Sequence, residues 1–264
     1  MYAFDFEKPD SLDAAIAALQ DDDAMALGGG QTLIPTLKQR LASPSRLVSL
    51  TGIAELHGIC TGSDGSVCIG ATTTHAQVAA GAAAFPALAA LAGGIGDPAV
   101  RNRGTIGGSL ANNDPSACYP AAALGAGATI VTNTRLIAAD DYFLGMFDTA
   151  LEEGELITEV RFPVPLAASY QKFVQPASRF ALVGVFVAKY ADSLRVAVTG
   201  ASEGGVFRWS EAEAALSARF MPEALAGLSL SGDDMISDVH GSGTYRAHLV
   251  GVMTKRAVVA ATQE

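Results

Sequence analysis

Residues 24–41 read AMALGGGQTLIPTLKQRL and carry the clearest structural signal in the chain. The apolar start predicts a short strand over 24–27, and the three glycines at 28–30 predict a tight turn directly after it. The apolar residues that then recur at helical spacing are Leu33, Leu37 and Leu41. A strand, a turn with exposed backbone and a helix in this order indicate an α/β arrangement at the start of the chain.

Segments on both sides of this stretch continue to mix helices and strands. A helix is predicted over 11–20 with Ser11 as its N-cap, and two helical pieces over 75–95 are separated at Pro86. The remaining predictions are strands at 46–50 and 66–74, a hairpin leading into a helix at 128–143, and a strand within 154–165.

The composition of the sequence changes near Pro163 to Pro165, where the part rich in alanine and glycine ends, and this change marks a candidate domain boundary. Beyond it, three strands are predicted within 170–176, 181–192 and 194–202, and helices within 210–220 and 245–262. The chain is therefore predicted to be α+β, with one domain over 1–166 and a second over 167–264. The second domain is expected to hold a three-stranded antiparallel sheet and a helical layer.

Composition excludes several classes of protein. Half of the 264 residues are hydrophobic and only 17% are charged, which is not typical of disordered, collagenous or coiled-coil chains. The net charge of -10 opposes binding to a phosphate backbone, so a nucleic-acid partner is not expected. The N-terminus lacks the positive region of a signal peptide, and no apolar run is long enough to span a bilayer, so a cytoplasmic location is expected.

The cysteines and histidines show no metal-binding pattern in the sequence. Cys60, Cys68 and Cys118 include no C-x-x-C pair, so neither a disulfide framework, a zinc finger nor an iron-sulfur site is predicted. Reduced thiols are the simplest interpretation, and no metal site is expected. The four histidines are scattered without metal-ligand spacing, and no catalytic residue is assigned to this chain.

The first glycine-rich loop, at 28–32, is a candidate cradle for a phosphate. Glycines leave the backbone N–H groups accessible, and a strand-to-helix turn directs several of them toward one anion. Leu33 stands where a dinucleotide fingerprint requires its third glycine, and no Gly-Lys-Ser/Thr follows, so neither common nucleotide motif is present. An ordinary strand-to-helix turn remains the alternative.

A second loop is predicted over 95–115, where the sequence is polar and rich in glycine. Residues 105–109 would form a second anion-binding nest of backbone N–H groups, and Asn112, Asn113 and Asp114 would offer hydrogen bonds to hydroxyl groups. The alternative is a long loop that caps its own turns through its Asn and Asp side chains. Two nests that serve one ligand would suit a diphosphate.

Three stretches together resemble a known family: GGGQTLIPTLKQRL at 28–41, GATTTHAQVA at 70–79 and IGDPAVRNRGTIGGSLANNDPSACYPAAALGAGA at 95–128. They are similar to the FAD-binding medium subunit of molybdenum hydroxylases, the carbon monoxide dehydrogenase and xanthine dehydrogenase group. The resemblance runs from Phe4 to about Pro165 and resumes at 170–188. It implies a two-part FAD-binding domain of the vanillyl-alcohol-oxidase type, subdivided near 55–60, followed by a small C-terminal domain.

The resemblance also implies which residues hold the cofactor, FAD. Those expected at its pyrophosphate and ribityl chain are Ala26, Leu27, Gly28, Gly29, Gly30, Gln31, Thr32, Leu33, Thr105, Ile106, Gly107, Gly108 and Ser109, with Asn112 and Asp114 beside them. Ile157 matches a position whose backbone meets the adenine side, with a plain buried strand residue as the alternative. Lys172 matches a lysine close to the flavin, with a solvated strand residue as the alternative.

One position departs from the family pattern. Many relatives have an acidic residue where this chain has Cys118, and a thiol cannot accept hydrogen bonds as a carboxylate does. A ribose contact carried by that acid is therefore in doubt, although Asp114 or a backbone group would offer a substitute. The alternative for Cys118 is a small buried hydrophobic residue.

The implied function is electron transfer within a complex. A molybdopterin large subunit would oxidise the substrate, an iron-sulfur small subunit would pass single electrons, and non-covalent FAD on this chain would collect two for an external acceptor. Two other functions remain open at this point: a free-standing flavin oxidoreductase, and a non-enzymatic nucleotide-binding or assembly module. The organic substrate and the acceptor are not encoded in any recognisable residue of this chain.

Overall fold

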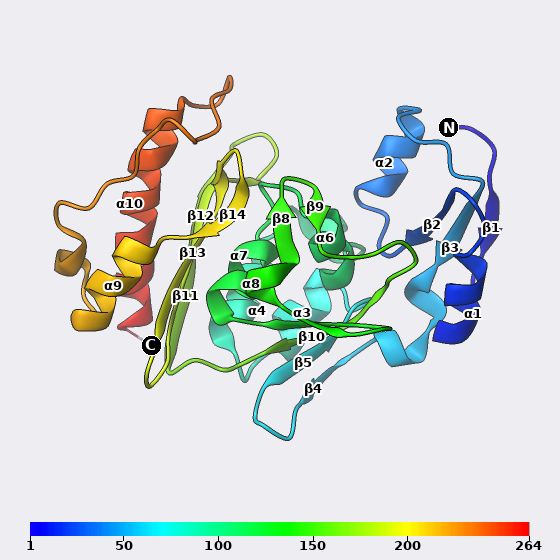
Figure 1. Cartoon of the computed structure of the whole chain (residues 1–264), viewed down its shortest axis with the longest axis horizontal. Helices are drawn as coiled ribbons and strands as arrows, with labels where there is room; N and C mark the ends of the chain where they lie inside the picture. Colours follow the sequence, from blue (N-terminus) through cyan, green and yellow to red (C-terminus); the bar gives the residue numbers. More distant parts are fainter. Residues whose placement is uncertain (264) are drawn as a thin grey trace.

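The computed structural model describes residues 1–263 and contains three principal sheets arranged along the long axis of the molecule (Figure 1). Only Glu264, the last residue of the predicted C-terminal domain, lies outside the described residues. Within them, no helix combines the length and apolarity needed to cross a membrane.

The first sheet is parallel and contains the two strands that the sequence predicts at 24–27 and 46–50, together with a strand at 5–7 that it does not predict. Its strands run in the order β1-β3-β2, and helices follow β1 and β2. The elements are β1 (Asp5–Glu7), α1 (Leu12–Ala18), β2 (Ala24–Leu27), α2 (Leu33–Lys38) and β3 (Arg46–Ser49). The predicted cap of α1 is confirmed, because the Ser11 side chain accepts a hydrogen bond from the Ala14 N–H.

The second sheet is antiparallel, with the strand order β4-β5-β10-β6-β7. Two short 3₁₀ turns, η1 (Leu50–Gly52) and η2 (Ala54–Leu56), lead into it from β3. Its strands are β4 (Ile59–Thr61), β5 (Val67–Gly70), β6 (Thr129–Thr132), β7 (Leu136–Ala138) and β10 (Ile157–Phe162). Val160 and Phe162 of β10 are fully buried, because alternate residues of this central strand point into the core.

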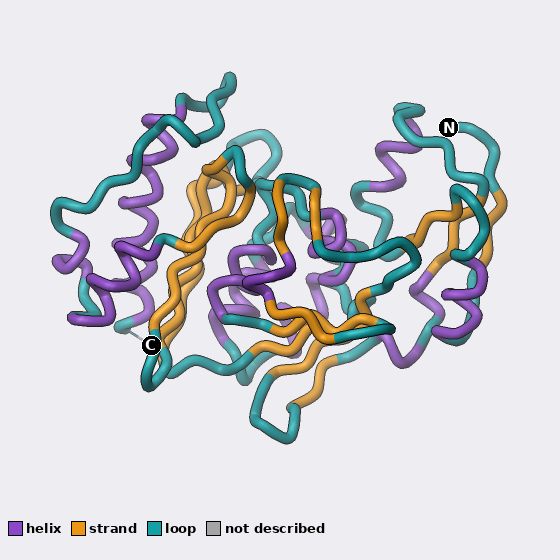
Figure 2. The backbone as a smooth tube through the Cα atoms, viewed as in Figure 1, coloured by secondary structure: helices purple, strands orange, loops and turns teal. Residues whose placement is uncertain are grey.

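Helices fill the space between this sheet and the C-terminal sheet (Figure 2). They are α3 (His75–Gly81), α4 (Pro86–Gly93), α7 (Tyr119–Ala126) and α8 (Ala139–Tyr142). The predicted break at Pro86 is confirmed, since the proline occupies the first turn of α4, where a missing N–H costs nothing. Every residue of α7 is buried, because the helix packs against the C-terminal sheet and against the helices α4 and α8.

The segment predicted as a loop over 95–115 contains two short helices instead, α5 (Pro98–Arg101) and α6 (Ile106–Asn112). Asp97 and Thr105 cap them by accepting the N–H groups of residues three positions later. Asn113 ends α6 in a left-handed conformation, and its amide donates to the carbonyls of Gly145 and Asp148. These bonds hold a small hairpin of β8 (Phe143–Gly145) and β9 (Asp148–Thr149).

The C-terminal sheet has four antiparallel strands, so the prediction of three is wrong. The three predicted strands are β11 (Ala167–Val174), β12 (Ala181–Lys189) and β13 (Leu194–Ser202); the missed strand is β14 (Gly205–Arg208). This strand of four residues is too short to show a periodicity. It pairs with β13 across the tight turn at 202–205.

Helices cover one face of this sheet: α9 (Ser210–Ala218) and α10 (Gly243–Ala261), with the 3₁₀ turn η3 (Pro222–Leu225) between them. Buried Arg246 of α10 donates to the carbonyls of Leu182 and Gly200 and pairs with Asp238 at 2.8 Å. The hydrogen bonds of Arg246 therefore stabilise the contact between α10 and the sheet, in addition to apolar packing.

Candidate functional site

A cavity of about 600 Å³ lies where the two glycine-rich segments meet the C-terminal sheet. Three parts of the chain that are far apart in sequence line it together with His75: residues 25–42, residues 95–118 and residues 172–180. A space of this size, lined by apolar residues and a few polar groups, is typical of a cofactor site.

The structure brings most of the predicted site residues to this cavity. Those that line it are Ala26, Leu27, Gly28, Gly29, Gly30, Gln31, Thr32, Leu33, Thr105, Gly108, Ser109, Asn112, Asp114 and Lys172. Ile106 and Gly107 are buried in the first turn of α6, and Ile157 lies in the core on β10, so these three do not line the cavity.

The first glycine-rich loop presents free hydrogen-bond donors. Within residues 1–263, none of the backbone N–H groups from Gly28 to Thr32 donates a hydrogen bond. Gly30 has a φ of +74°, a conformation that favours glycine and turns the chain sharply before α2. Several unsatisfied N–H groups in one concave turn have the geometry that suits an anion, and the binding of a phosphate there stays a prediction.

The glycines of this loop also let it touch the second glycine-rich segment. A Cβ atom on Gly29 would overlap the backbone carbonyl of Arg103, and one on Gly28 would lie 2.9 Å from the Thr105 hydroxyl. From the sequence, the glycines at 28–30 are expected to leave room for a ligand. The structure shows that Gly29 is needed first for contact between the two loops.

The second segment does not present the expected row of free N–H groups. The N–H of Ile106 donates to Thr73, that of Gly107 to Ala71, and that of Ser109 to Thr105, all at backbone carbonyls. The N–H of Gly108 donates to the Thr105 side chain at 3.2 Å. This wall therefore offers the hydroxyl groups of Thr105 and Ser109 rather than a second nest of N–H groups.

Lys172 brings a positive charge to the opposite wall. Its ammonium group donates to the carbonyl of Gly94 at 2.8 Å and to that of Arg179 at 3.0 Å. It also lies 3.6 Å from the sulfur of Cys118, which is buried and lines the cavity. Lys172 is half-buried on β11, and its ammonium group is held by backbone carbonyls from two different loops.

His75 is a lining residue that the sequence analysis left without a role. Burial, with a smaller contribution from the charge of Arg101, lowers its pKa to about 4, so the ring is neutral near pH 7. Its Nδ1 atom has no hydrogen-bond partner among the described residues. The sequence offers one indication of a special position for His75, which is that it begins a helix directly after the capping residue Thr74.

A family model matches the first part of the chain, and two relatives match nearly all of it. Residues 2–165 match the family described as the FAD binding domain in molybdopterin dehydrogenase. The chain is 33% identical to the carbon monoxide dehydrogenase medium chain of Hydrogenophaga pseudoflava, over 98% of this chain and 96% of that one. It is 35% identical to the nicotine 6-hydroxylase medium subunit of Paenarthrobacter nicotinovorans, over 98% of this chain and 97% of that one.

The fold agrees with solved structures of such complexes. A chain of carbon monoxide dehydrogenase from Hydrogenophaga pseudoflava superposes with a TM-score of 0.89 at 33% identity, covering 99% of this chain and 98% of that one. A chain of quinoline 2-oxidoreductase from Pseudomonas putida 86 superposes with a TM-score of 0.87 at 31% identity, with coverages of 99% and 98%. The protein belongs to the family of FAD-binding domains of molybdopterin dehydrogenases.

Proposed function

We propose that this chain is the FAD-carrying medium subunit of a molybdenum hydroxylase complex. The observation that carries the proposal is the glycine-rich loop at 28–32, whose unsatisfied N–H groups open into a cavity of about 600 Å³. The membership in the FAD-binding family supports the same ligand. Bound FAD would supply the redox chemistry, in which electrons are accepted one at a time and released as a pair.

Different walls of the cavity would hold different parts of FAD. The N–H groups of the first loop would bind the pyrophosphate, and the hydroxyls of Thr105 and Ser109 would complete its hydrogen bonds. Asn112 and Asp114 would contact hydroxyl groups of the ribityl chain or ribose. Lys172 would lie near the flavin ring, and the backbone at Ile157 would meet the adenine side.

The arrangement of sheets supports a division into domains. A two-part FAD-binding domain of the vanillyl-alcohol-oxidase type would cover 1–166, divided near 55–60, where the chain leaves β3 for β4. A C-terminal domain would cover 167–264, and the separate apolar core between its sheet and α10 supports this boundary.

Within the complex, this chain would receive electrons from an iron-sulfur small subunit, which takes them from a molybdopterin large subunit. Relatives of similar identity are named for carbon monoxide, nicotine and quinoline, so the likeness of this chain does not identify one substrate. We infer that the substrate is selected elsewhere in a cytoplasmic complex, and that this chain supplies the exit for electrons.

Two measurements test the proposal. Acid precipitation of the purified protein should release a yellow chromophore into the supernatant, because the FAD is held without a covalent bond. Co-expression with the neighbouring genes should then yield a complex that contains iron and molybdenum. A chain that stays alone and rapidly oxidises a small molecule would instead be a free-standing oxidoreductase, and a protein that stays colourless with excess FAD would be no flavoprotein.

A further inference from the structure

Two thiols and a carboxylate meet on the outer side of the central sheet, away from the cavity. They belong to Cys60 on β4, Cys68 on β5 and Glu159 on β10. The two sulfur atoms and a carboxylate oxygen all lie within 4.8 Å of one another. None of the three residues lines the cavity, so this cluster is separate from the proposed FAD site.

The register of the sheet holds the three groups together. Cys60 lies directly opposite Cys68 on the neighbouring strand. Glu159 lies opposite Gly70, two residues along the same strand as Cys68, so all three side chains share one face. The flanking residues Val67 and Ile69 are buried in the apolar core, which fixes the face that the thiols occupy.

The charges around the cluster suit a divalent cation. Arg161 donates from Nε to one carboxylate oxygen of Glu159 at 2.6 Å, which orients that carboxylate. Two thiolates, one carboxylate, the Arg161 guanidinium and a divalent ion sum to zero charge. Because the two thiolates and the carboxylate would lie within 4.8 Å of one another, a cation would relieve the repulsion between these negative groups.

We propose that Cys60, Cys68 and Glu159 form a binding site for a thiophilic divalent cation of the zinc class. Zinc takes thiolate and carboxylate ligands, and a tetrahedral ion with three protein ligands keeps one position for water or another small ligand. Cys60 is exposed whereas Cys68 is buried, so the site is reached from solvent on the Cys60 side. Binding releases the two thiol protons, so the affinity falls as the pH falls.

Cobalt is the probe that tests this site. The full-length protein, reduced and stripped of metal with a chelator, is titrated with Co²⁺ and followed by difference absorbance. We expect one equivalent to bind with a thiolate-to-cobalt charge-transfer band, and Zn²⁺ to displace it. Cys60→Ser and Cys68→Ser should each weaken binding by roughly 100-fold, and Glu159→Gln by about 10-fold.

Cys118→Ser is the matched control, because it removes the third thiol and should leave the cobalt affinity unchanged. Cys60 lies at an exposed strand edge, so its serine variant tests the site without disturbing the core. Absence of the charge-transfer band in the reduced protein would overturn the proposal. Equal cobalt affinity in the Cys60→Ser variant would mean an adventitious ion only, and a Cys60–Cys68 disulfide that resists the reductant would also overturn it.

Discussion

Gly29 is the residue at which the two walls of the proposed phosphate site touch. The carbonyl of Arg103 occupies the space that a Cβ atom on Gly29 would need. Because both partners are backbone atoms, the contact cannot be relieved by rotation of a side chain. The shape of the cavity at this point therefore depends on the absence of a single methyl group.

Gly29→Ala should separate the two loops, weaken FAD binding and lower the free energy of unfolding by about 1–3 kcal/mol. Gly251→Ala is the control, since a Cβ there has open space in the middle of α10 and should stabilise the protein by about 0.5–1 kcal/mol. Urea denaturation and FAD titration of both variants measure the two effects. Equal stability of Gly29→Ala and the wild type would show that the loops do not touch.

Lys172 carries the positive charge nearest to Cys118, and its two carbonyl bonds fix its position. Lys172→Met should lower the reduction potential of the bound flavin, because a nearby cation favours the more negative reduced state. A shift on the order of 30 mV is expected, equivalent to about 1.4 kcal/mol for a two-electron couple.

Spectroelectrochemistry of the FAD-loaded protein measures this shift. Lys255→Met on α10 serves as the control, since Lys255 does not line the cavity and its loss should leave the potential unchanged. An unaltered potential in Lys172→Met would leave Lys172 with a structural role only.

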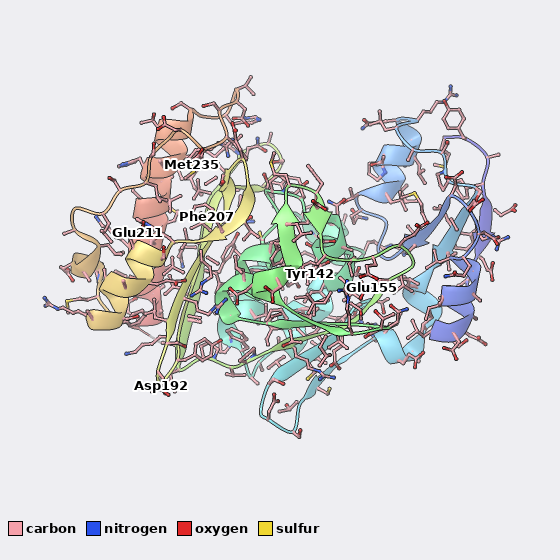
Figure 3. The ribbon with its side chains drawn as sticks, viewed as in Figure 1. Tyr142, Glu155, Asp192, Phe207, Glu211 and Met235 are labelled. Carbon is pink, nitrogen blue, oxygen red and sulfur yellow. The ribbon has the colours of Figure 1, made fainter. Side chains whose placement is uncertain are left out.

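At the scale of elements, one carboxylate joins the β6–β7 hairpin to the turn that precedes β10. Glu155, labelled in Figure 3, accepts hydrogen bonds from the hydroxyls of Thr132 and Thr134, from the Arg135 guanidinium and from the Glu152 N–H. The bond from Arg135 is the largest cause that lowers the pKa of this carboxyl well below its usual range. The charged form therefore stabilises the connection between these elements.

The contribution of Glu155 to stability should be present above its unfolded pKa of about 4.3 and should be lost as the pH falls below that value. Glu155→Gln should cost on the order of 2 kcal/mol near neutral pH and flatten the pH dependence of unfolding. Glu153→Gln, an exposed residue of the same turn, is the control. Urea denaturation across this pH range checks both, and a parallel decline in wild type and Glu155→Gln would contradict the assignment.

At the scale of the whole molecule, the cavity is shared by three separate stretches of the chain. A ligand that contacts all three should raise the stability of the folded chain by mass action, by about 2.7 kcal/mol at a free concentration of 100 times Kd. Riboflavin, which lacks the diphosphate, should stabilise the protein less than FAD at equal concentration.

Thermal unfolding of the FAD-stripped protein with FAD or riboflavin measures this difference. Equal stabilisation by the two ligands would mean that the N–H groups of the first loop do not bind the diphosphate. In the Gly29→Ala variant, FAD should stabilise the protein little more than riboflavin does, because the first loop is displaced.

Features that depend on near neighbours in the chain could be predicted from the amino-acid sequence. The cap at Ser11, the break at Pro86 and the glycine turn at 28–30 each follow from residues within a few positions. The stretches at 28–41, 70–79 and 95–128 indicated the family and led to FAD. Caps, breaks and tight turns can be predicted because they depend on the backbone preferences of neighbouring residues, and the family can be recognised because its motifs are continuous in the sequence.

The way in which distant groups combine is visible only in the folded chain. It shows that the N–H groups of residues 106–109 are used by other parts of the chain and that Lys172 is bound between two loops. It also places Cys60 opposite Cys68 and pairs the short strand β14 with β13. Strand register and the closure of loops set these contacts, and both depend on atoms far apart in the sequence, so no local pattern encodes them.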